Sequence, residues 1–192
     1  LARRGGATCA AMEVSSHALD QHRCDGLRFS AGVFTNLSGD HLDYHGTMEA
    51  YLGAKRRLFD LLAPDGTAVI NADDDAGRTL ARALPARVMT FGLASSCDLW
   101  AEMRTMDRSG SEFILHGRGW ERDVRLPLVG RHNISNALAA AGAAEALGVS
   151  PDATRTGLEQ ARNVPGRLQR VEPDGWPFSV FVDYDHTDAA LE

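Results

Sequence analysis

The stretch from Ala31 to Asn71 reads AGVFTNLSGDHLDYHGTMEAYLGAKRRLFDLLAPDGTAVIN. Its beginning, Ala31–Leu37, and its end, Thr67–Asn71, are continuous apolar runs, which is the pattern of strands covered on both faces. Between them a helix is expected from about Thr47, a good N-cap residue, to Leu62, where Ala-Pro-Asp-Gly ends it. A strand, a helix and a strand in this order predict a βαβ unit and therefore a parallel sheet.

The alternation of strands and helices continues on both sides of this unit. An earlier apolar run, Ala7–Val14, is expected to be another strand covered on both faces. After the unit we expect a helix at Asp73–Leu84 and a short strand at Arg87–Gly92. Together these elements predict an α/β fold with a mostly parallel sheet flanked by helices.

The pattern changes in the second half of the chain. Three segments look like short strands joined by Gly- and Ser-rich turns with no helix between them: Leu99–Met106, Glu112–His116 and Asp123–Leu128. We therefore expect a small antiparallel β appendage. Two helices are expected after it, Ile134–Leu147 and Asp152–Ala161, and Ser150-Pro151 is a typical start for the second.

A domain boundary is expected at Asn163-Val-Pro-Gly166. Residues 1–164 then form one domain, and residues 165–192 begin a second one, which the buried-type strand Ser179–Tyr184 opens. The chain does not start with methionine, and Asp188–Glu192 reads like the first turn of a helix. We therefore expect these residues to be a fragment of a longer protein.

Composition excludes several classes of protein. The chain of 192 residues has 26 acidic and 20 basic residues, and its formal charge is −6. It has no basic stripe with interleaved aromatic residues, so nucleic-acid binding is not expected. The three cysteines, Cys9, Cys24 and Cys97, are odd in number and far apart, which indicates neither a disulfide framework nor a cysteine zinc site. No run is long enough for a membrane span, so we expect a cytoplasmic protein.

Polar residues cluster at the ends of the three predicted parallel strands. Glu13–His17 follows the first strand, Asn36–His41 the second and Asn71–Asp74 the third. Ligands of parallel α/β sheets bind at the carboxyl ends of the strands, so these clusters predict a functional site. The alternative is that Ser and Asp at strand ends only cap the helices that follow.

Lys55 is the least expected residue of the helix that follows DHLDYHG. At about 100° per residue Lys55 lies near the centre of an apolar stripe, and Arg56 and Arg57 point away from it. The stripe consists of Met48, Tyr51, Leu52, Phe59 and Leu62. One interpretation is a lysine whose stem lies along apolar surface and whose amine reaches water. The other is that burial lowers the pKa of the amine, which then takes up carbon dioxide and becomes an anionic carbamate able to bind a metal.

The carboxylates of the clusters are ligands for a hard cation, magnesium first, especially where nucleotide phosphates supply further oxygens. Zinc remains an alternative because of His17, His41 and His45, although no HExxH pair is present. The histidines are equally compatible with capping or core positions. Further along, Asn133 is either an N-cap or a carboxamide that reads a base such as adenine, and Arg167 is a guanidinium suited to phosphate.

Five segments resemble the Mur ligase family, and among its members those that add the third amino acid to the peptidoglycan precursor. They are MEVSSHALDQHR (Met12–Arg23), FTNLSGDHLDYHGTMEAYLGAKRRLF (Phe34–Phe59), GRHNISNALAA (Gly130–Ala140), PGRLQRV (Pro165–Val171) and VDYDHTDAALE (Val182–Glu192). The resemblance runs over nearly the whole chain. It implies a central Mur ligase domain in residues 1–164 and the start of the C-terminal domain in residues 165–192.

The resemblance implies an ATP-dependent amide ligase of cell-wall synthesis, with roles in cell shape and division. Its substrates would be UDP-N-acetylmuramoyl-L-alanyl-D-glutamate (UDP-MurNAc-L-Ala-D-Glu) and diaminopimelate or lysine, and it would act as a monomer with ATP and Mg²⁺. By the family pattern Glu13 and His41 hold magnesium, His41 is also catalytic, and carbamylated Lys55 joins a second metal. The remaining positions implied by the family are Ser15, Gln21 and Arg23 for the UDP-sugar peptide, Asn133 for adenine, Arg167 for the nucleotide and Asp183 for the ribose or the hinge.

The chain also departs from the family pattern. The glycine-rich GxxGKT phosphate loop, which would precede Glu13, does not occur in residues 1–12, so the isolated chain is predicted to be inactive. Asp185 and Asp188 stand in DYDHTDAALE where the family usually has DYAHTPDALE. Three alternatives therefore stay open: a non-catalytic nucleotide-binding or scaffold domain of the same fold, another Mur-like ligase such as folylpolyglutamate synthase, and a zinc hydrolase.

Overall fold

The structure, a computed structural model, describes residues 5–39, 41–162, 164–167, 169–171, 178 and 180–184. In chain order its helices and strands are α1 (Ser16–Asp20), β1 (Phe29–Phe34), α2 (Leu42–His45), α3 (Met48–Asp60), β2 (Leu62–Asn71), α4 (Asp75–Ala83), β3 (Arg87–Gly92), β4 (Leu99–Asp107), β5 (Gly110–Gly117), β6 (Trp120–Leu126), α5 (Arg131–Ala146), α6 (Pro151–Glu159), β7 (Gln169–Val171) and β8 (Val180–Val182). Within these residues no helix is both long and apolar enough to cross a membrane.

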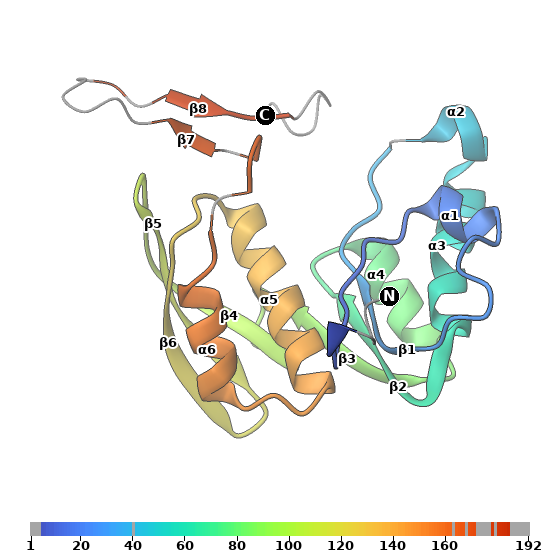
Figure 1. Cartoon of the computed structure of the whole chain (residues 1–192), viewed down its shortest axis with the longest axis horizontal. Helices are drawn as coiled ribbons and strands as arrows, with labels where there is room; N and C mark the ends of the chain where they lie inside the picture. The colour runs from blue at the N-terminus through green and yellow to red at the C-terminus, as the bar shows by residue number, and fades with distance from the viewer. Residues whose placement is uncertain are drawn as a thin grey trace.

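One mixed sheet of six strands forms the centre of the molecule, in the order β1-β2-β3-β4-β5-β6 (Figure 1). The pairs β1–β2, β2–β3 and β3–β4 are parallel, and the pairs β4–β5 and β5–β6 are antiparallel. The predicted fold class is therefore confirmed, including the antiparallel appendage. A separate two-stranded antiparallel sheet joins β7 to β8. The expected strand near Ser179–Tyr184 therefore exists, but it is not buried as predicted, since Phe181 and Val182 are exposed, and its partner β7 was not predicted.

Local sequence signals start α3 and α6 close to where they were expected, whereas α5 begins at Arg131, three residues before the predicted Ile134. The Thr47 side chain accepts a hydrogen bond from the Ala50 amide at 3.2 Å and begins α3. The Ser150 side chain does the same for the Ala153 amide at 3.3 Å, and Pro151 occupies the first position of α6. Such caps satisfy amide groups that have no partner inside the helix.

The predicted first strand, Ala7–Val14, is wrong. These residues have no strand structure, and nearly all of them are exposed. The reason is that a strand exists only where a neighbouring strand takes up its hydrogen bonds, and in the described part of the chain β1 pairs with β2 alone. The apolar composition of the segment therefore does not make it a strand here.

The helix before β2, α3, ends two residues earlier than Leu62, where the sequence predicted its end. The helix ends at Asp60, and Ala63–Gly66 belongs to β2. Gly66 is needed there, because a Cβ atom at this position would lie 2.9 Å from the carbonyl oxygen of Phe29 on the neighbouring strand. The register between β1 and β2 shifts at the same place, between Phe29 and Ala31.

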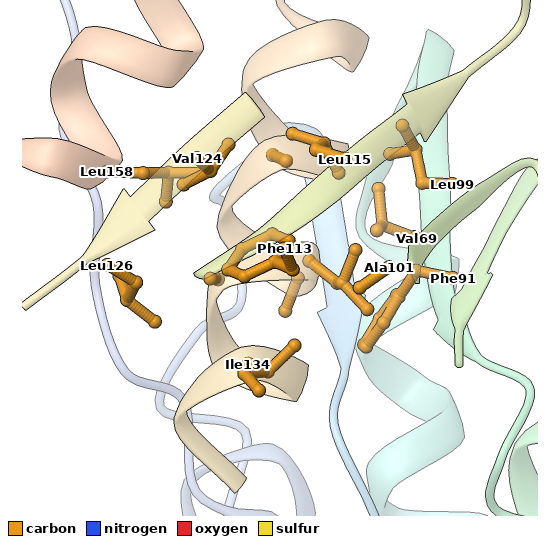
Figure 2. Packing of buried hydrophobic residues seen from close by; sticks show 14 of the residues in the cluster. Val69, Phe91, Leu99, Ala101, Phe113, Leu115, Val124, Leu126, Ile134 and Leu158 are labelled. Atoms are coloured by element: carbon orange, nitrogen blue, oxygen red, sulfur yellow. The ribbon is translucent and has the colours of Figure 1, made fainter. Parts of the chain in front are cut away.

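Two hydrophobic clusters cover the two faces of the sheet, because successive residues of a strand point to opposite sides. On β2, Val69 belongs to the cluster under α5 and α6, and Ile70 belongs to the cluster under α3 and α4. Figure 2 shows the first cluster, in which Phe91 of β3 and Phe113 and Leu115 of β5 pack together with Ile134 of α5. The helices therefore lie on both faces of the parallel part, as predicted.

Candidate functional site

The segments after β1, β2 and β3 meet at one edge of the sheet, called here the carboxyl edge: residues 35–37, 71–74 and 93. The Asn71 side chain donates to the Thr35 carbonyl oxygen at 2.7 Å, and the Leu37 amide donates to Asp74 Oδ2 at 3.0 Å. The segment after β3 is bound in the same way, since the Leu93 amide donates to Asp73 Oδ2 at 2.9 Å. Two of the three predicted polar clusters are therefore joined at this edge. Asp74 also caps α4, so the capping interpretation is correct for this residue.

The remaining polar cluster, Glu13–His17, is linked to the others through two short helices that were not predicted, α1 and α2. Ser15 caps α1 by accepting a hydrogen bond from the Ala18 amide at 3.1 Å. The buried Ser16 hydroxyl lies 2.9 Å from His45 Nε2 at the end of α2. This bond joins the segment that contains Glu13 to the segment DHLDYHG. Glu13 itself is exposed in the coil before α1, and Asp40 lies outside the described residues.

His17, His41 and His45 form a histidine cluster between α1 and α2. The His17 ring centre lies 5.0 Å from that of His41 and 5.3 Å from that of His45. Tyr51 of α3 completes the group, since its ring stacks on His45 at 5.0 Å and meets His41 edge-on at 5.9 Å. Burial lowers the pKa of His45, and the neighbouring His17 and His41 lower it further.

His41 is held in an unusual backbone conformation. Its φ angle is 60°, in the left-handed region that residues with a side chain rarely adopt. The residue precedes α2, whose first helical residue is Leu42. Such backbone strain persists only where surrounding contacts maintain it, and it is often found at functional sites.

Lys55 lies half-buried between the helix and the carboxyl edge. Its Nζ atom donates to the Asn36 carbonyl oxygen at 3.1 Å and lies 5.0 Å from the centre of the Tyr51 ring. Burial lowers the pKa of the amine, and the Asp74 carboxylate opposes this effect in part. Lys55 is also the only lysine in the chain. Of the two interpretations made from the sequence, this geometry favours the buried amine, because its hydrogen bond points into the site.

The neighbouring arginines behave as expected from the helical stripe. Arg56 and Arg57 are exposed. Arg57 Nη1 donates to the carbonyl oxygen of Asp20 at 3.2 Å and lies 3.4 Å from Asp20 Oδ1. A cation at this place neutralises the unsatisfied carbonyl groups at the carboxyl end of α1.

The residues predicted to bind a UDP-sugar peptide, Ser15, Gln21 and Arg23, lie on or next to α1. Gln21 is the C-cap of this helix, and its carboxamide oxygen accepts a hydrogen bond from Arg23. Its carboxamide nitrogen donates to the Tyr44 hydroxyl at 3.2 Å. Gln21 and Arg23 are both exposed, so they are accessible to a ligand.

The predicted nucleotide-binding residues lie further along the chain. Asn133 is not an N-cap, because Gly130 holds that position with a φ angle of 99°. The Asn133 carboxamide nitrogen donates instead to the Val129 carbonyl oxygen at 2.7 Å. Arg167 and Asp183 are both exposed, and a hydrogen bond of 2.7 Å from the Tyr184 amide to the Gly166 carbonyl oxygen brings their two segments together. Asn163, Asp185 and Asp188 lie outside the described residues.

No three His, Cys, Asp or Glu side chains of the described ranges come together in a way that could hold a metal ion. A structural zinc ion normally takes four such ligands and a catalytic one three. A magnesium ion needs only one or two carboxylates when water and phosphate oxygens complete its shell. Among the described residues these side chains therefore do not form a zinc cage.

Comparison with known proteins gives a consistent result. A sequence family described as the Mur ligase middle domain matches residues 1–144. The UDP-N-acetylmuramoyl-L-alanyl-D-glutamate–2,6-diaminopimelate ligase of Geobacter metallireducens is 50% identical over 97% of this chain and 38% of its own length. The enzyme of the same name from Halalkalibacterium halodurans is 42% identical over 99% of this chain and 40% of its own length. The chain thus spans about two fifths of the length of these relatives.

Solved structures extend the likeness to three dimensions. A structure of UDP-N-acetylmuramoyl-L-alanyl-D-glutamate–2,6-diaminopimelate ligase covers 98% of this chain with a TM-score of 0.83 and 36% sequence identity, and the match takes in 39% of that structure. MurF ligase from Thermotoga maritima, solved in complex with ADP, covers 80% of this chain and 35% of its own, with a TM-score of 0.69. At 21% identity the second match concerns the fold alone.

Proposed function

Because the chain belongs to the Mur ligase family, we propose that it is part of an ATP-dependent amide ligase of peptidoglycan precursor synthesis. The enzyme adds meso-diaminopimelate, the third amino acid, to UDP-MurNAc-L-Ala-D-Glu. Residues 1–164 belong to its central, ATP-binding domain, and residues 165–192 begin its C-terminal domain. Two relatives named as 2,6-diaminopimelate ligases support diaminopimelate over lysine. One is 50% identical over 97% of the chain, and the other is 42% identical over 99% of it.

The observation that carries the proposal is the position of Lys55. Its amine lies at the carboxyl edge, where ligands of parallel α/β sheets bind, and burial lowers its pKa. A neutral amine there adds to carbon dioxide through its lone pair and loses one proton, and the product is a carbamate anion. The carbamate nitrogen keeps one hydrogen, which still suits the Asn36 carbonyl oxygen 3.1 Å away. We therefore assign Lys55 as a carbamylated residue of the active site.

Glu13 and His41 are proposed to hold one Mg²⁺, and the carbamate of Lys55 is proposed to bind a second metal ion beside it. The placement of His41 and Lys55 against the same ring supports this assignment, since the His41 ring lies 5.9 Å and Lys55 Nζ 5.0 Å from the Tyr51 ring centre. When bound, the ions neutralise negative charge on the nucleotide phosphates. His41 is the residue of this set whose imidazole also lies in the histidine cluster, so we assign it to both metal binding and catalysis.

The ligation consists of two displacements. A carboxylate oxygen of the UDP-linked dipeptide attacks the γ-phosphorus of ATP, which forms an acyl phosphate and releases ADP. The amine of diaminopimelate then attacks the acyl carbon, phosphate leaves, and the amine loses a proton. These steps require little covalent chemistry from the protein, so the residues contribute mainly by positioning the reactants and balancing their charge.

The other predicted residues are assigned to the two substrates. Ser15, Gln21 and Arg23 bind the UDP-sugar peptide, and their common location at α1 supports one shared role. Asn133 contacts the adenine, Arg167 the phosphates and Asp183 the ribose or the hinge between domains. Because its substrates are water-soluble nucleotides and amino acids, we propose that the enzyme works in the cytoplasm as a monomer, without a membrane or nucleic-acid partner.

The assignment of Lys55 is tested on the chain itself with ¹³C-bicarbonate. Since Lys55 is the only lysine, a carbamate carbon resonance can come only from it or from the terminal α-amino group. The matched control is Lys55→Arg, which keeps the positive charge and the α-amino group. We expect a resonance that is present in the wild type and absent in the variant. Identical spectra would favour the non-catalytic scaffold instead.

The reaction is tested on the complete protein in which these residues lie. It is incubated with ATP, UDP-MurNAc-L-Ala-D-Glu and either diaminopimelate or lysine, and phosphate release and product mass are followed. We expect product with diaminopimelate, and about a hundredfold lower kcat for Lys55→Arg, as for loss of one preorganised charged group. Phosphate release without an amide product, or product with lysine alone, would contradict the proposal. The 192-residue chain by itself is expected not to ligate, because it lacks a GxxGKT loop.

A further inference from the structure

The hydroxyl of Tyr44 occupies the centre of a polar network between α1, α2 and α3. It donates to Asp20 Oδ2 at 3.0 Å and accepts from Gln21 Nε2 at 3.2 Å. The Gln21 carboxamide oxygen in turn accepts from Arg23. At the other end of the network, Asp20 Oδ1 lies 3.4 Å from Arg57 Nη1 on α3. The network thus runs from α3 through the end of α1 to two residues already assigned to the UDP-linked substrate.

The network determines which way the Gln21 carboxamide faces. The Asp20 carboxylate only accepts hydrogen bonds, so the Tyr44 hydroxyl must give its proton to Asp20. The hydroxyl oxygen is then left as an acceptor, and only the NH₂ end of the Gln21 carboxamide can bind to it. The carboxamide oxygen therefore faces Arg23, whose guanidinium has only donors.

Helix α1 cannot provide this order by itself. It has 5 residues, and isolated helices shorter than about 12 residues are unstable in water. Gln21 is its C-cap, so the position of this side chain depends on the contacts that hold the end of α1. Those contacts come from Tyr44 on α2 and Arg57 on α3. The Tyr44 ring also packs against His17 with ring centres 4.2 Å apart.

We propose that Tyr44 is a positioning residue for the anionic UDP-linked substrate, acting through Gln21 and Arg23. Its hydroxyl holds the Gln21 carboxamide in one orientation, and the carboxamide oxygen holds the Arg23 guanidinium. The remaining N–H groups of Arg23 then serve a phosphate or carboxylate of the substrate. This inference rests on the proposed function, since it names the ligand that Gln21 and Arg23 receive.

The test is Tyr44→Phe in the complete ligase, because this change removes the hydroxyl and keeps the ring against His17. Loss of one hydrogen bond that orders a binding group is expected to raise KM for UDP-MurNAc-L-Ala-D-Glu about three- to tenfold. We expect kcat and KM for ATP to stay within about twofold, because the network touches neither Lys55 nor the nucleotide residues. The melting temperature serves as the control for folding.

A double-mutant cycle with Gln21→Ala separates positioning from a general structural role. If Tyr44 acts through Gln21, Tyr44→Phe changes KM no further once Gln21 is alanine. The inference is overturned if Tyr44→Phe leaves KM unchanged, or if its effect is equally large in the Gln21→Ala background. A wild-type protein that does not use UDP-MurNAc-L-Ala-D-Glu at all overturns the proposed function itself, and this outcome is distinct from the other two.

Discussion

Replacing Gly77 by alanine tests how closely α4 must approach the carboxyl edge. Gly77 lies in the first turn of α4, and a Cβ atom there would lie 1.9 Å from the Asn71 carbonyl oxygen. This oxygen belongs to the backbone of β2, so it cannot turn away as a side chain does. The first turn of α4 must therefore move away from the end of β2, and with it Asp74, whose carboxylate caps the helix and accepts from the Leu37 amide.

The expected loss of stability follows from four contributions. Overpacking costs about 1–3 kcal/mol. Losing the Asp74 cap on the Gly77 amide, now 2.9 Å long, costs about 1 kcal/mol. Losing the bond of 3.0 Å between Asp74 and the Leu37 amide costs about 1 kcal/mol more. The better helix propensity of alanine offsets these losses by about 1 kcal/mol. We therefore expect Gly77→Ala to lower the free energy of unfolding by about 2–4 kcal/mol.

Urea denaturation followed by circular dichroism measures this change. The matched controls are Gly53→Ala in α3 and Gly157→Ala in α6, where a Cβ atom would meet nothing within 4 Å. Both controls are expected to stabilise the protein by up to about 1 kcal/mol through helix propensity. A Gly77→Ala variant with the midpoint and slope of the wild type would refute the reasoning, because it would mean that α4 tolerates the methyl group where it stands.

Two further predictions concern ionisable groups. Burial disfavours the Asp98 carboxylate, but hydrogen bonds from Thr90 and Arg118 outweigh it and lower the pKa below 3.8. Because the folded-state pKa is depressed, its stabilisation is present above the unfolded value and is lost as the pH falls. Asp98→Asn should therefore cost about 1–2 kcal/mol at pH 7 in urea melts, and this difference should shrink below about pH 4; an equal loss at both pH values would contradict it. For Lys55, a pH titration that follows the ¹³C shift of the side-chain carbon bonded to Nζ should give a pKa below 10.5 for the amine. A pKa of 10.5 would show instead that the amine is solvated.

Much of the central fold follows from local sequence patterns. The apolar runs around the helix of Lys55 predicted parallel strands, and β1 and β2 pair in parallel. Thr47 and Ser150-Pro151 predicted the starts of α3 and α6 because a cap acts on amide groups within three residues of itself. The antiparallel pairing of β4, β5 and β6 was equally readable, since these strand patterns have no helix between them, whereas the parallel pairing of β3 with β4 was not predicted.

Contacts between distant residues decided the rest. Period, capping and turn signals act over a few neighbours, so they predicted most of the helices and strands and the residues that carry reactive groups. Long-range contacts account for three features that these signals did not predict. Ala7–Val14 has no strand partner among the described residues, Tyr44 and Arg57 hold the short α1, and Asn133 turns toward the Val129 carbonyl oxygen. A lone segment cannot encode these outcomes, since each depends on hydrogen-bond partners that only folding brings close.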